Sequence, residues 1–338
     1  MRVLFTFAGG AGHFEPLVPI ARAAAAAGHA VAFTCAAGMV PVVAERGFAA
    51  MPTVPGEPAH PPERRPLVPA DTEHELRVLR EYYGGRLARE RAAAIPDRCA
   101  EWRADVLVCD EADFGCAQAA ERAGLPLAMV QVAAPGFVPD DLAIDAGLVL
   151  SPFPASYRPG DAHRFRVHDA APAAGDELYV TLGTIFPTEC GDLFTRVLLG
   201  LDAVPVTVSV GRDVDPAELG RQPPRVRVER HVDQAEVLPR CRAVISHGGS
   251  GTVLAALSYA LPSVLLPMGA DQPWNARRCE ELGVARVLDP VSATPADVRA
   301  AVAHTPACRA AAARLQREIA RLPAASELVP RLEALACG

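Results

Sequence analysis

A histidine followed by a glycine-rich turn is the strongest chemical signal in this sequence. The segment His247-Gly-Gly-Ser-Gly-Thr252 follows residues 243–246, an apolar run typical of a strand, and precedes residues 253–260, which are typical of a helix. A glycine-rich turn that opens a helix leaves backbone N–H groups unpaired, and the helix dipole adds partial positive charge there. The pattern predicts an anion site, most often for phosphate. A tight turn without a ligand is the alternative.

A second histidine, His13, lies in a glycine-rich segment directly after the first predicted strand. The segment matches a dinucleotide fingerprint only in part, because Gly10 and Gly12 are present but Glu15 stands at the third glycine position. This disfavours a nicotinamide enzyme. At a strand end His13 is a candidate general base, since an imidazole has an ordinary pKa of about 6.5. The alternative is a histidine that only caps the next helix.

A base histidine needs a carboxylate that orients its other ring nitrogen. Asp110 ends the apolar run 105–109 and lies at the same predicted sheet edge as His13. Asp113 and Glu111 are close enough in sequence to substitute for it. The alternative for all three is a solvated loop acid, and we adopt that interpretation for Glu111.

Strand and helix patterns alternate along the chain, which favours parallel α/β sheets. Strands are predicted at 2–8, 29–36, 105–110, 126–132, 177–182, 204–210, 226–232, 243–247, 262–267 and 284–289, and helices in the first half at 15–27, 39–47, 71–101 and 114–124. Residues 135–174 are rich in Pro and Gly and contain the natural linker. Two such halves would bind ligands at the carboxyl ends of their strands.

Composition speaks against several classes of function. The net charge of −7 and the pI of about 5.7 disfavour partners such as nucleic acid or an anionic membrane surface. The nine cysteines show no CxxC pair and no zinc-ligand spacing, which favours free thiols in a reducing compartment. No cleavable leader is evident, and no apolar run approaches the roughly 20 residues of a membrane span. We expect a cytoplasmic protein.

The run from Val226 to Pro290 resembles the donor-binding half of family 1 glycosyltransferases, which have the GT-B fold and use nucleotide-diphospho-sugars. The actinobacterial members that decorate antibiotics are the most similar. The resemblance is strongest over residues 177–290 and is also good over residues 1–50 and 104–132. It implies two doubly wound Rossmann-like domains that face each other across a cleft. In the first half, the Gly-His pair with Pro16-Leu-Val-Pro19 matches the loop of the family's catalytic base, and Asp110 matches the dyad aspartate.

The resemblance implies a domain division as well. We expect an N-terminal acceptor-binding domain at residues 1–155, a linker at 156–175 and a donor-binding domain at 176–322. The final helix, within 323–338, is expected to cross back to the N-terminal domain. The acceptor-facing parts look shortened compared with the family, and the candidates to line them are Phe14, Phe114, Phe137 and Leu142, for each of which core packing is the alternative.

On the donor side, the family's motif contacts the diphosphate through its histidine and the amides of the turn. The matching residues here are His247, Gly249, Ser250, Gly251 and Thr252, joined by Thr184 from the loop 181–184. Asp271 and Gln272 match the pair that hydrogen-bonds the sugar hydroxyls. Around the base, the matching residues are His231, Val232 and Arg212, and Asp233 replaces a usual proline, which puts the rigidity of that turn in doubt.

One departure from the family bears on the nucleotide. Uridine-specific members carry a ribose-binding Glu eight residues after the motif histidine, where this chain has Ala255. A methyl group cannot accept from a 2′-hydroxyl, so Ala255 points to a thymidine-diphosphate sugar. The alternative is that Ala255 only packs its helix. Asp213-Val-Asp215 has the spacing of metal-dependent transferases of another fold, but we interpret it as a loop or helix-cap acid, so no metal is expected.

We therefore expect an inverting, metal-independent hexosyltransferase that needs no cofactor and uses a TDP-sugar as co-substrate. His13, oriented by Asp110, would deprotonate a hydroxyl of a natural-product aglycone in antibiotic biosynthesis. Two alternatives stay open: a UDP-sugar-dependent small-molecule transferase, and a catalytically silent homologue that activates a partner transferase. Whether the protein forms a homodimer is also open.

Overall fold

The computed structural model describes residues 1–53, 64–184, 186–201 and 204–338. The chain divides into two compact units. Unit 1 comprises Met1–His60, Glu73–Val167 and Leu322–Gly338, and unit 2 comprises Pro61–Thr72 and His168–Arg321. The step from unit 1 to unit 2 at residue 167 lies within the segment 156–175 that the sequence predicts as a linker.

Unit 1 is built on a seven-stranded parallel sheet of order β3-β2-β1-β4-β5-β6-β7. Its strands are β1 (Arg2–Thr6), β2 (Ala30–Cys35), β3 (Ala49–Pro52), β4 (Val106–Asp110), β5 (Leu127–Val130), β6 (Leu148–Ser151) and β7 (His163–Arg164). The four strands predicted in this half are confirmed as β1, β2, β4 and β5. The other three were not predicted, because they are short and β6 and β7 lie in the Pro- and Gly-rich part of the chain.

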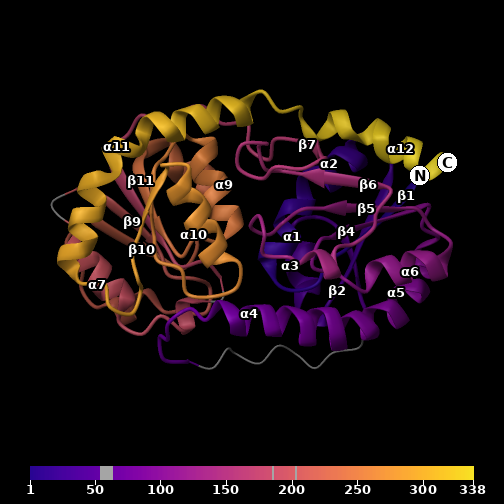
Figure 1. Ribbon diagram of the computed structural model, residues 1–338, viewed down its shortest axis with the longest axis horizontal. Coiled ribbons are helices and arrows are strands. Elements are labelled where there is room, and N and C mark those ends of the chain that lie inside the picture. Colours follow the sequence, from indigo (N-terminus) through magenta and orange to yellow (C-terminus); the bar gives the residue numbers. More distant parts are fainter. Residues whose placement is uncertain (54–63, 185, 202–203) are drawn as a thin grey trace. The chain divides into compact units, whose positions relative to one another are not determined.

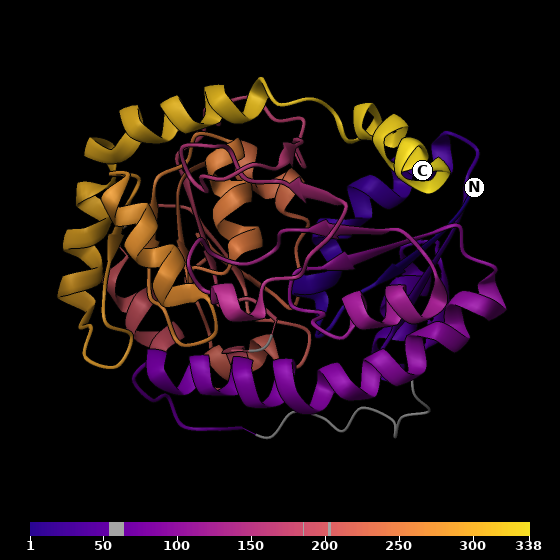
Figure 2. The ribbon, with the colours of Figure 1, turned by 45° about the vertical axis from the view of Figure 1, so that its right-hand side comes forward.

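Helices cover both faces of this sheet (Figures 1 and 2). Leu328 and Leu332, at the end of η8 (Ala325–Leu328) and in α12 (Val329–Cys337), pack with α2 (Val18–Ala26) on the face that carries Phe5. On the other face α5 (Ala88–Trp102) and α6 (Cys116–Ala123) lie side by side over Leu4 and Leu107. Since successive strand residues point to opposite faces, burial on both faces explains why these strands read as unbroken apolar runs.

The long helix predicted at 71–101 is not uniformly α-helical. It consists of α4 (Thr72–Val78), a π-helical segment η3 (Leu79–Leu87) and α5. The π-helical segment contains Gly84, where an added Cβ would come within 2.9 Å of Leu142 Cδ2 in η4 (Asp140–Leu142). The helix backbone thus approaches η4 more closely than a side chain would allow. The remaining short elements of unit 1 are α1 (Ala11–Phe14), η1 (Glu15–Leu17), η2 (Ala37–Met39) and α3 (Val40–Glu45).

Unit 2 contains a six-stranded parallel sheet of order β10-β9-β8-β11-β12-β13. All six strands predicted in this half are confirmed, as β8 (Glu177–Thr181), β9 (Val206–Ser209), β10 (Val226–Glu229), β11 (Cys241–Ser246), β12 (Ser263–Leu265) and β13 (Ala285–Val287). The helices are η5 (Phe186–Thr188), α7 (Leu193–Gly200), η6 (Pro216–Leu219), α8 (Gln234–Val237), η7 (Leu238–Arg240), α9 (Ser250–Ser258), α10 (Gln272–Glu281) and α11 (Pro295–Ala320). The longest, α11, begins at a capping box in which Thr294 and Asp297 satisfy each other's backbone N–H.

The two sheets follow one topology. Counted from its first strand, each sheet has the order 3-2-1-4-5-6, which is the doubly wound Rossmann order, and β7 extends the first sheet at its edge. The strand order reverses between β1 and β4 in unit 1, and between β8 and β11 in unit 2. Ligands of such sheets bind outside the carboxyl ends of the strands at this switch point. The predicted fold class, two Rossmann-like α/β domains, is confirmed.

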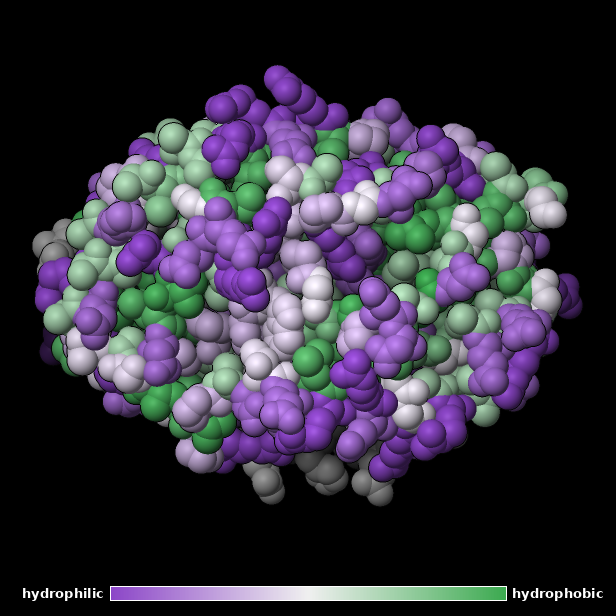
Figure 3. All heavy atoms as spheres, in the orientation of Figure 1, coloured by the Kyte–Doolittle hydropathy of each residue, from purple (hydrophilic) through white to green (hydrophobic). Residues whose placement is uncertain are grey.

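On the face drawn in Figure 3, apolar residues form small separate patches among hydrophilic ones. Among the described residues, the large hydrophobic side chains that are most exposed are Val68, Tyr82, Leu199 and Val291. Within the same part of the chain, no helix is both long enough and apolar enough to span a membrane.

Candidate active site

His13 follows β1 at the switch point of unit 1. The chain leaves the strand through Gly9, whose φ of +132° belongs to the region that favours glycine. An added Cβ on Gly9 would come within 2.6 Å of His13 Cδ2, so the imidazole lies directly against the glycine backbone. The His13 side chain is 27% exposed, and its Nδ1 lies 3.4 Å from Oδ1 of Asp110. The structure thus brings together the two residues predicted as base and orienting carboxylate.

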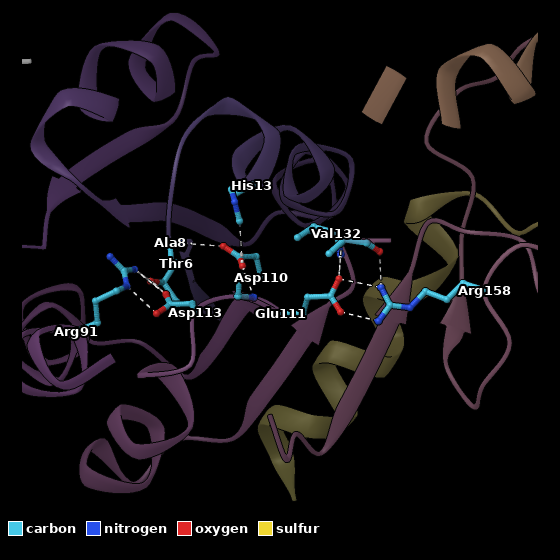
Figure 4. Close-up of polar contacts among 11 residues, drawn as sticks. Thr6, Ala8, His13, Arg91, Asp110, Glu111, Asp113, Val132 and Arg158 are labelled. Carbon is cyan, nitrogen blue, oxygen red and sulfur yellow. Dashed lines mark hydrogen bonds and ion pairs between the residues drawn. The ribbon is translucent and has the colours of Figure 1, made fainter. Parts of the chain in front are cut away.

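Asp110, the last residue of β4, is fully buried and held from three sides (Figure 4). Its Oδ2 accepts a hydrogen bond from the backbone N–H of Ala8 at 2.7 Å, and its Oδ1 accepts one from Ala112 N–H at 2.6 Å. These two backbone donors fix the orientation of the carboxylate. An ionised carboxylate in this place can orient the His13 ring and stabilise an imidazolium.

Asp113, the alternative partner for His13, is engaged elsewhere. It is fully buried and forms a two-pronged ion pair with Arg91 of α5, with both N···O distances 2.6 Å. Thr6 of β1 donates to Asp113 Oδ2 at 2.8 Å, and Arg91 also donates to Thr6 and to Thr53. Asp113 therefore joins the ends of β1 and β4 to α5, directly behind the Asp110–His13 pair.

The interpretation of Glu111 as a solvated loop acid is wrong. Glu111 is only 4% exposed, and its carboxylate pairs with the guanidinium of Arg158 at 2.8 and 2.7 Å. It also accepts from the backbone N–H groups of Val132, at 2.6 Å, and Ala133. The three neighbouring acids thus tie the end of β4 to three different parts of unit 1. Neither Arg91 nor Arg158 carries a local sequence signal, because their partners lie 22 and 47 residues away.

The residues proposed to line the acceptor site differ in their environment. Phe14 is fully buried and packs against Phe7 and Phe33, so the core-packing alternative holds for it. Phe114, Phe137 and Leu142 are half-buried.

His247 follows β11 at the switch point of unit 2 and is buried. Added Cβ atoms on Gly183, after β8, and on Gly249 would come within 2.6 and 2.5 Å of its Nε2, so two glycine backbones enclose the ring. Nδ1 has no hydrogen-bond partner among the described residues. Burial lowers the pKa of His247 to about 4, against a smaller opposing effect of the Thr181 backbone carbonyl. His247 is therefore neutral near pH 7. Thr184, in the same loop as Gly183, is exposed.

The first turn of α9 is joined to the start of α10. Ser250 Oγ donates to Oδ2 of Asp271 at 2.7 Å, and the amide of Asn275 donates to Ser250 at 2.9 Å and to Asp271 at 3.1 Å. Gly251 and Thr252 complete this turn. Asn275 is fully buried and was not predicted, although it follows Asp271 by four residues and so shares its helix face. Ser250, from the predicted phosphate residues, and Asp271, from the predicted sugar residues, therefore form one hydrogen-bonded group with Asn275.

Gln272 has a structural task in addition to its predicted one. It is 2% exposed, and its side-chain carbonyl accepts from the backbone N–H groups of Met268 at 2.8 Å and Gly269 at 3.4 Å. The carbonyl oxygen thus closes the loop before α10. If Gln272 also contacts a sugar, its side-chain NH₂ group would make that contact.

The predicted base-binding residues meet at the ends of β9 and β10. Arg230 donates to the backbone carbonyls of Arg212 at 3.3 Å and Val214 at 3.1 Å, which ties the two loops together. His231 is exposed and Val232 half-buried. Asp233, which replaces the usual proline, caps α8: its side chain accepts a hydrogen bond from the Ala235 N–H at 2.9 Å.

Asp215 and Ala255 each have a structural role in unit 2. Asp215 accepts from the Ala217 N–H at 3.0 Å in a capping box with Glu218, which agrees with its interpretation as a helix-cap acid. Among the described residues, no three His, Cys, Asp or Glu side chains cluster as metal ligands would. Ala255 is 1% exposed and packs in a core cluster with Tyr179 and Tyr259, so its methyl group also has the packing role left open above.

Comparisons with known proteins identify relatives of the whole chain. A family model of the C-terminal domain of erythromycin biosynthesis protein CIII-like proteins matches residues 201–335. The L-demethylnoviosyl transferase of Streptomyces niveus is 29% identical over 331 residues, which cover 84% of each chain. The elloramycin glycosyltransferase ElmGT of Streptomyces olivaceus is 29% identical over 383 aligned positions, which cover 98% of this chain and 97% of the relative.

Solved structures show the same fold. The spinosyn rhamnosyltransferase SpnG superposes with a TM-score of 0.80 over 98% of this chain and 100% of its own, at 20% identity. Its likeness concerns the fold, whereas the relatives above share sequence over most of their length. Together, the motifs, the two Rossmann sheets and these relatives show that the chain is similar to antibiotic glycosyltransferases of family 1, which have the GT-B fold.

Proposed function

We propose that this glycosyltransferase moves a deoxysugar or other hexose from a TDP-sugar to a hydroxyl of a natural-product aglycone, with inversion and without a metal. The observation that carries the proposal is the presence of a different histidine at each switch point. His13 is paired with a buried carboxylate, and His247 lies at the start of α9 with no carboxylate partner. The first arrangement suits a base, and the second suits a group that binds phosphate.

In the proposed step, His13 takes the proton of the acceptor hydroxyl while Asp110 stabilises the resulting imidazolium. The acceptor oxygen forms a bond to the anomeric carbon of the sugar. The bond from that carbon to the diphosphate oxygen breaks on the opposite side, so the configuration inverts. The leaving diphosphate takes the electron pair and binds the His247 side chain and the N–H groups that open α9.

The choice of thymidine diphosphate rests on two observations. The position that would carry a ribose-binding Glu holds the buried methyl group of Ala255, which offers no acceptor to a 2′-hydroxyl. SpnG, which shares the fold, has been solved in complex with thymidine diphosphate. A relative's ligand supports the proposal only by analogy, so the nucleotide must be measured on this chain.

The way in which charge can be neutralised in unit 2 supports the proposed metal independence. The dipole and open N–H groups of α9 meet the developing charge of the diphosphate. Asp215, the acid that could have held a cation, is used as a helix cap. We place the reaction in the cytoplasm, since none of the nine cysteines, all of them within the described ranges, forms a disulfide.

Calorimetry with thymidine diphosphate and uridine diphosphate, each with and without EDTA, tests the donor half of the proposal. We expect tighter binding of thymidine diphosphate and no effect of the chelator. Equal affinities, or a preference for uridine diphosphate, would contradict the thymidine assignment and leave the transferase assignment intact. Loss of thymidine diphosphate binding in EDTA that Mg²⁺ restores would contradict metal independence.

A further inference from the structure

Two adjacent tyrosines of the π-helical segment η3 lie beside the candidate base. The Tyr83 ring is nearly parallel to the imidazole of His13, with 6.3 Å between centroids and 17° between planes. Tyr82 stands perpendicular to Tyr83, with centroids 5.2 Å apart. We call these three side chains the aromatic row. It runs from His13 to Tyr82, which is 47% exposed.

The two tyrosines do not have the environment of core residues. Neither is part of the cluster that buries Phe5 or of the cluster that buries Leu107. Tyr157 of the same unit is, by contrast, fully buried and stacks on Phe153. Only 5% of the chain is aromatic, so an exposed ring and a half-buried ring beside a candidate base are better explained by ligand contact than by packing.

The backbone under the aromatic row is firmly placed. A π-helix is rare and often marks a functional site. Here it is fixed to η4 by two contacts: Gly84 lies against Leu142, and Arg80 pairs with Asp141 at 3.1 Å. The segment therefore presents Tyr82 and Tyr83 at a defined position next to His13.

We propose that the aromatic row is an acceptor-binding surface that selects planar aromatic acceptors carrying a phenolic hydroxyl. The inference rests on the proposed function and specifies its acceptor class. A planar ring can stack offset on Tyr83 or meet Tyr82 edge-on, which are the two arrangements that aromatic pairs prefer. Stacking there brings a ring substituent close to the His13 imidazole, where the proton must be removed.

A phenol also suits the chemistry of the site. A phenolic hydroxyl has a pKa of about 10, whereas water has a pKa of about 15.7, so an imidazole removes a phenolic proton far more readily. In the step, the phenolic proton moves to His13 and the oxygen bonds to the anomeric carbon. The nucleoside diphosphate leaves with the electron pair of the broken bond.

The test compares two acceptors on four variants. The acceptors are a hydroxyanthraquinone and an aliphatic macrolactone that carries a secondary alcohol. The variants are Tyr83→Leu and Tyr82→Leu, which remove a ring but keep apolar bulk, Tyr83→Phe, which keeps the ring, and Arg86→Ala, an exposed control on the same π-helical segment. Binding of the hydroxyanthraquinone is titrated by fluorescence without donor, and the acceptor KM is measured wherever transfer occurs.

We expect Tyr83→Leu and Tyr82→Leu each to weaken hydroxyanthraquinone binding about 3- to 10-fold, the worth of one aromatic pair. Tyr83→Phe should retain wild-type binding, and Arg86→Ala should change nothing. Thymidine diphosphate affinity should be unaltered in all four. KM for the macrolactone should stay within about twofold, since an aliphatic ring cannot stack in this way.

Unchanged hydroxyanthraquinone binding in both leucine variants, or equal losses on both acceptors, would overturn the aromatic row as a selective surface. A wild-type protein that transfers sugar while the row proves inert would leave the proposed function standing. Conversely, ring-dependent binding of the hydroxyanthraquinone without transfer to any acceptor would support the row and contradict the proposed function.

Discussion

The candidate sites of the two units share a plan and differ in one partner. In each unit a histidine follows a strand at the switch point and rests against glycine backbone: His13 on Gly9, and His247 on Gly183 and Gly249. The Nδ1 of His13 faces a buried carboxylate, while that of His247 has no hydrogen-bond partner among the described residues.

Under the proposed function, this difference would give one residue type two chemical roles. A neighbouring carboxylate favours the charged imidazolium, so His13 can accept a proton during the reaction. Burial without a carboxylate disfavours the charge, and the pKa of His247 falls to about 4. A neutral His247 can donate a hydrogen bond to phosphate but does not act as a cation there.

Removing the base should have the largest effect. His13→Ala is expected to slow transfer by about 10²–10⁴-fold, the usual contribution of general-base catalysis, because no group remains to take the proton. Asp110→Asn should slow transfer less, since an amide still accepts a hydrogen bond but cannot stabilise the imidazolium by charge. Transfer rates at saturating donor test both variants. A near wild-type rate in His13→Ala would mean that the base lies elsewhere.

The buried ion pair between Arg91 and Asp113, behind His13, should contribute to the stability of unit 1. Arg91→Met leaves the buried Asp113 carboxylate without its cation and should lower the free energy of unfolding by about 3–5 kcal/mol. Urea unfolding measures it. Arg86→Ala, which breaks an exposed pair with Glu90, is the matched control and should change the free energy of unfolding far less, because exposed ion pairs contribute little. Similar losses in the two variants would show that burial of the Arg91 pair is unimportant.

Alanine substitutions at Gly9 and Gly183 test whether His13 and His247 have different roles. Gly9→Ala and Gly183→Ala each place a Cβ within 2.6 Å of a histidine ring at a positive φ, at a cost of about 1–3 kcal/mol. Gly9→Ala should slow transfer and spare thymidine diphosphate affinity. Gly183→Ala should weaken that affinity instead. Identical kinetic profiles for the two variants would refute the division of roles.

The smallest expected effect is the dependence of stability on pH. The folded-state pKa of His247 is depressed to about 4, below the unfolded value of about 6.5, so the unfolded state binds the proton first as pH falls. Stability from this group is full above pH 6.5 and is lost towards pH 4, by about 1–2 kcal/mol near pH 5. Chemical unfolding at pH 5 and 8 should show a smaller drop for His247→Asn than for wild type. Equal drops would argue against a neutral, buried His247.

Local sequence patterns predicted the sheets and the two histidine turns well. The strands β1, β8 and β11 are apolar runs followed closely by glycine, and both signals act within a few residues. The two histidine turns at these strand ends were therefore visible in the sequence. The strands β3, β6 and β7 are short, and each pairs with a neighbouring strand of the sheet.

The supporting contacts could not be predicted in this way. Glu111 looked like a solvated acid because its partner Arg158 lies 47 residues away in the chain. The contact between Gly84 of the π-helical segment and Leu142 is equally non-local. Only Asn275 could have been found, from its spacing of four residues after Asp271 on a predicted helix.

Calorimetric titration of thymidine diphosphate into wild type, His13→Ala and His247→Ala tests the central claim most directly. If His13 is the base and His247 binds the diphosphate, His13→Ala should bind like wild type. His247→Ala should bind more weakly by about 1.5–3 kcal/mol, the worth of a hydrogen bond to a charged group. Wild-type affinity in His247→Ala, or a comparable loss in His13→Ala, would contradict the account.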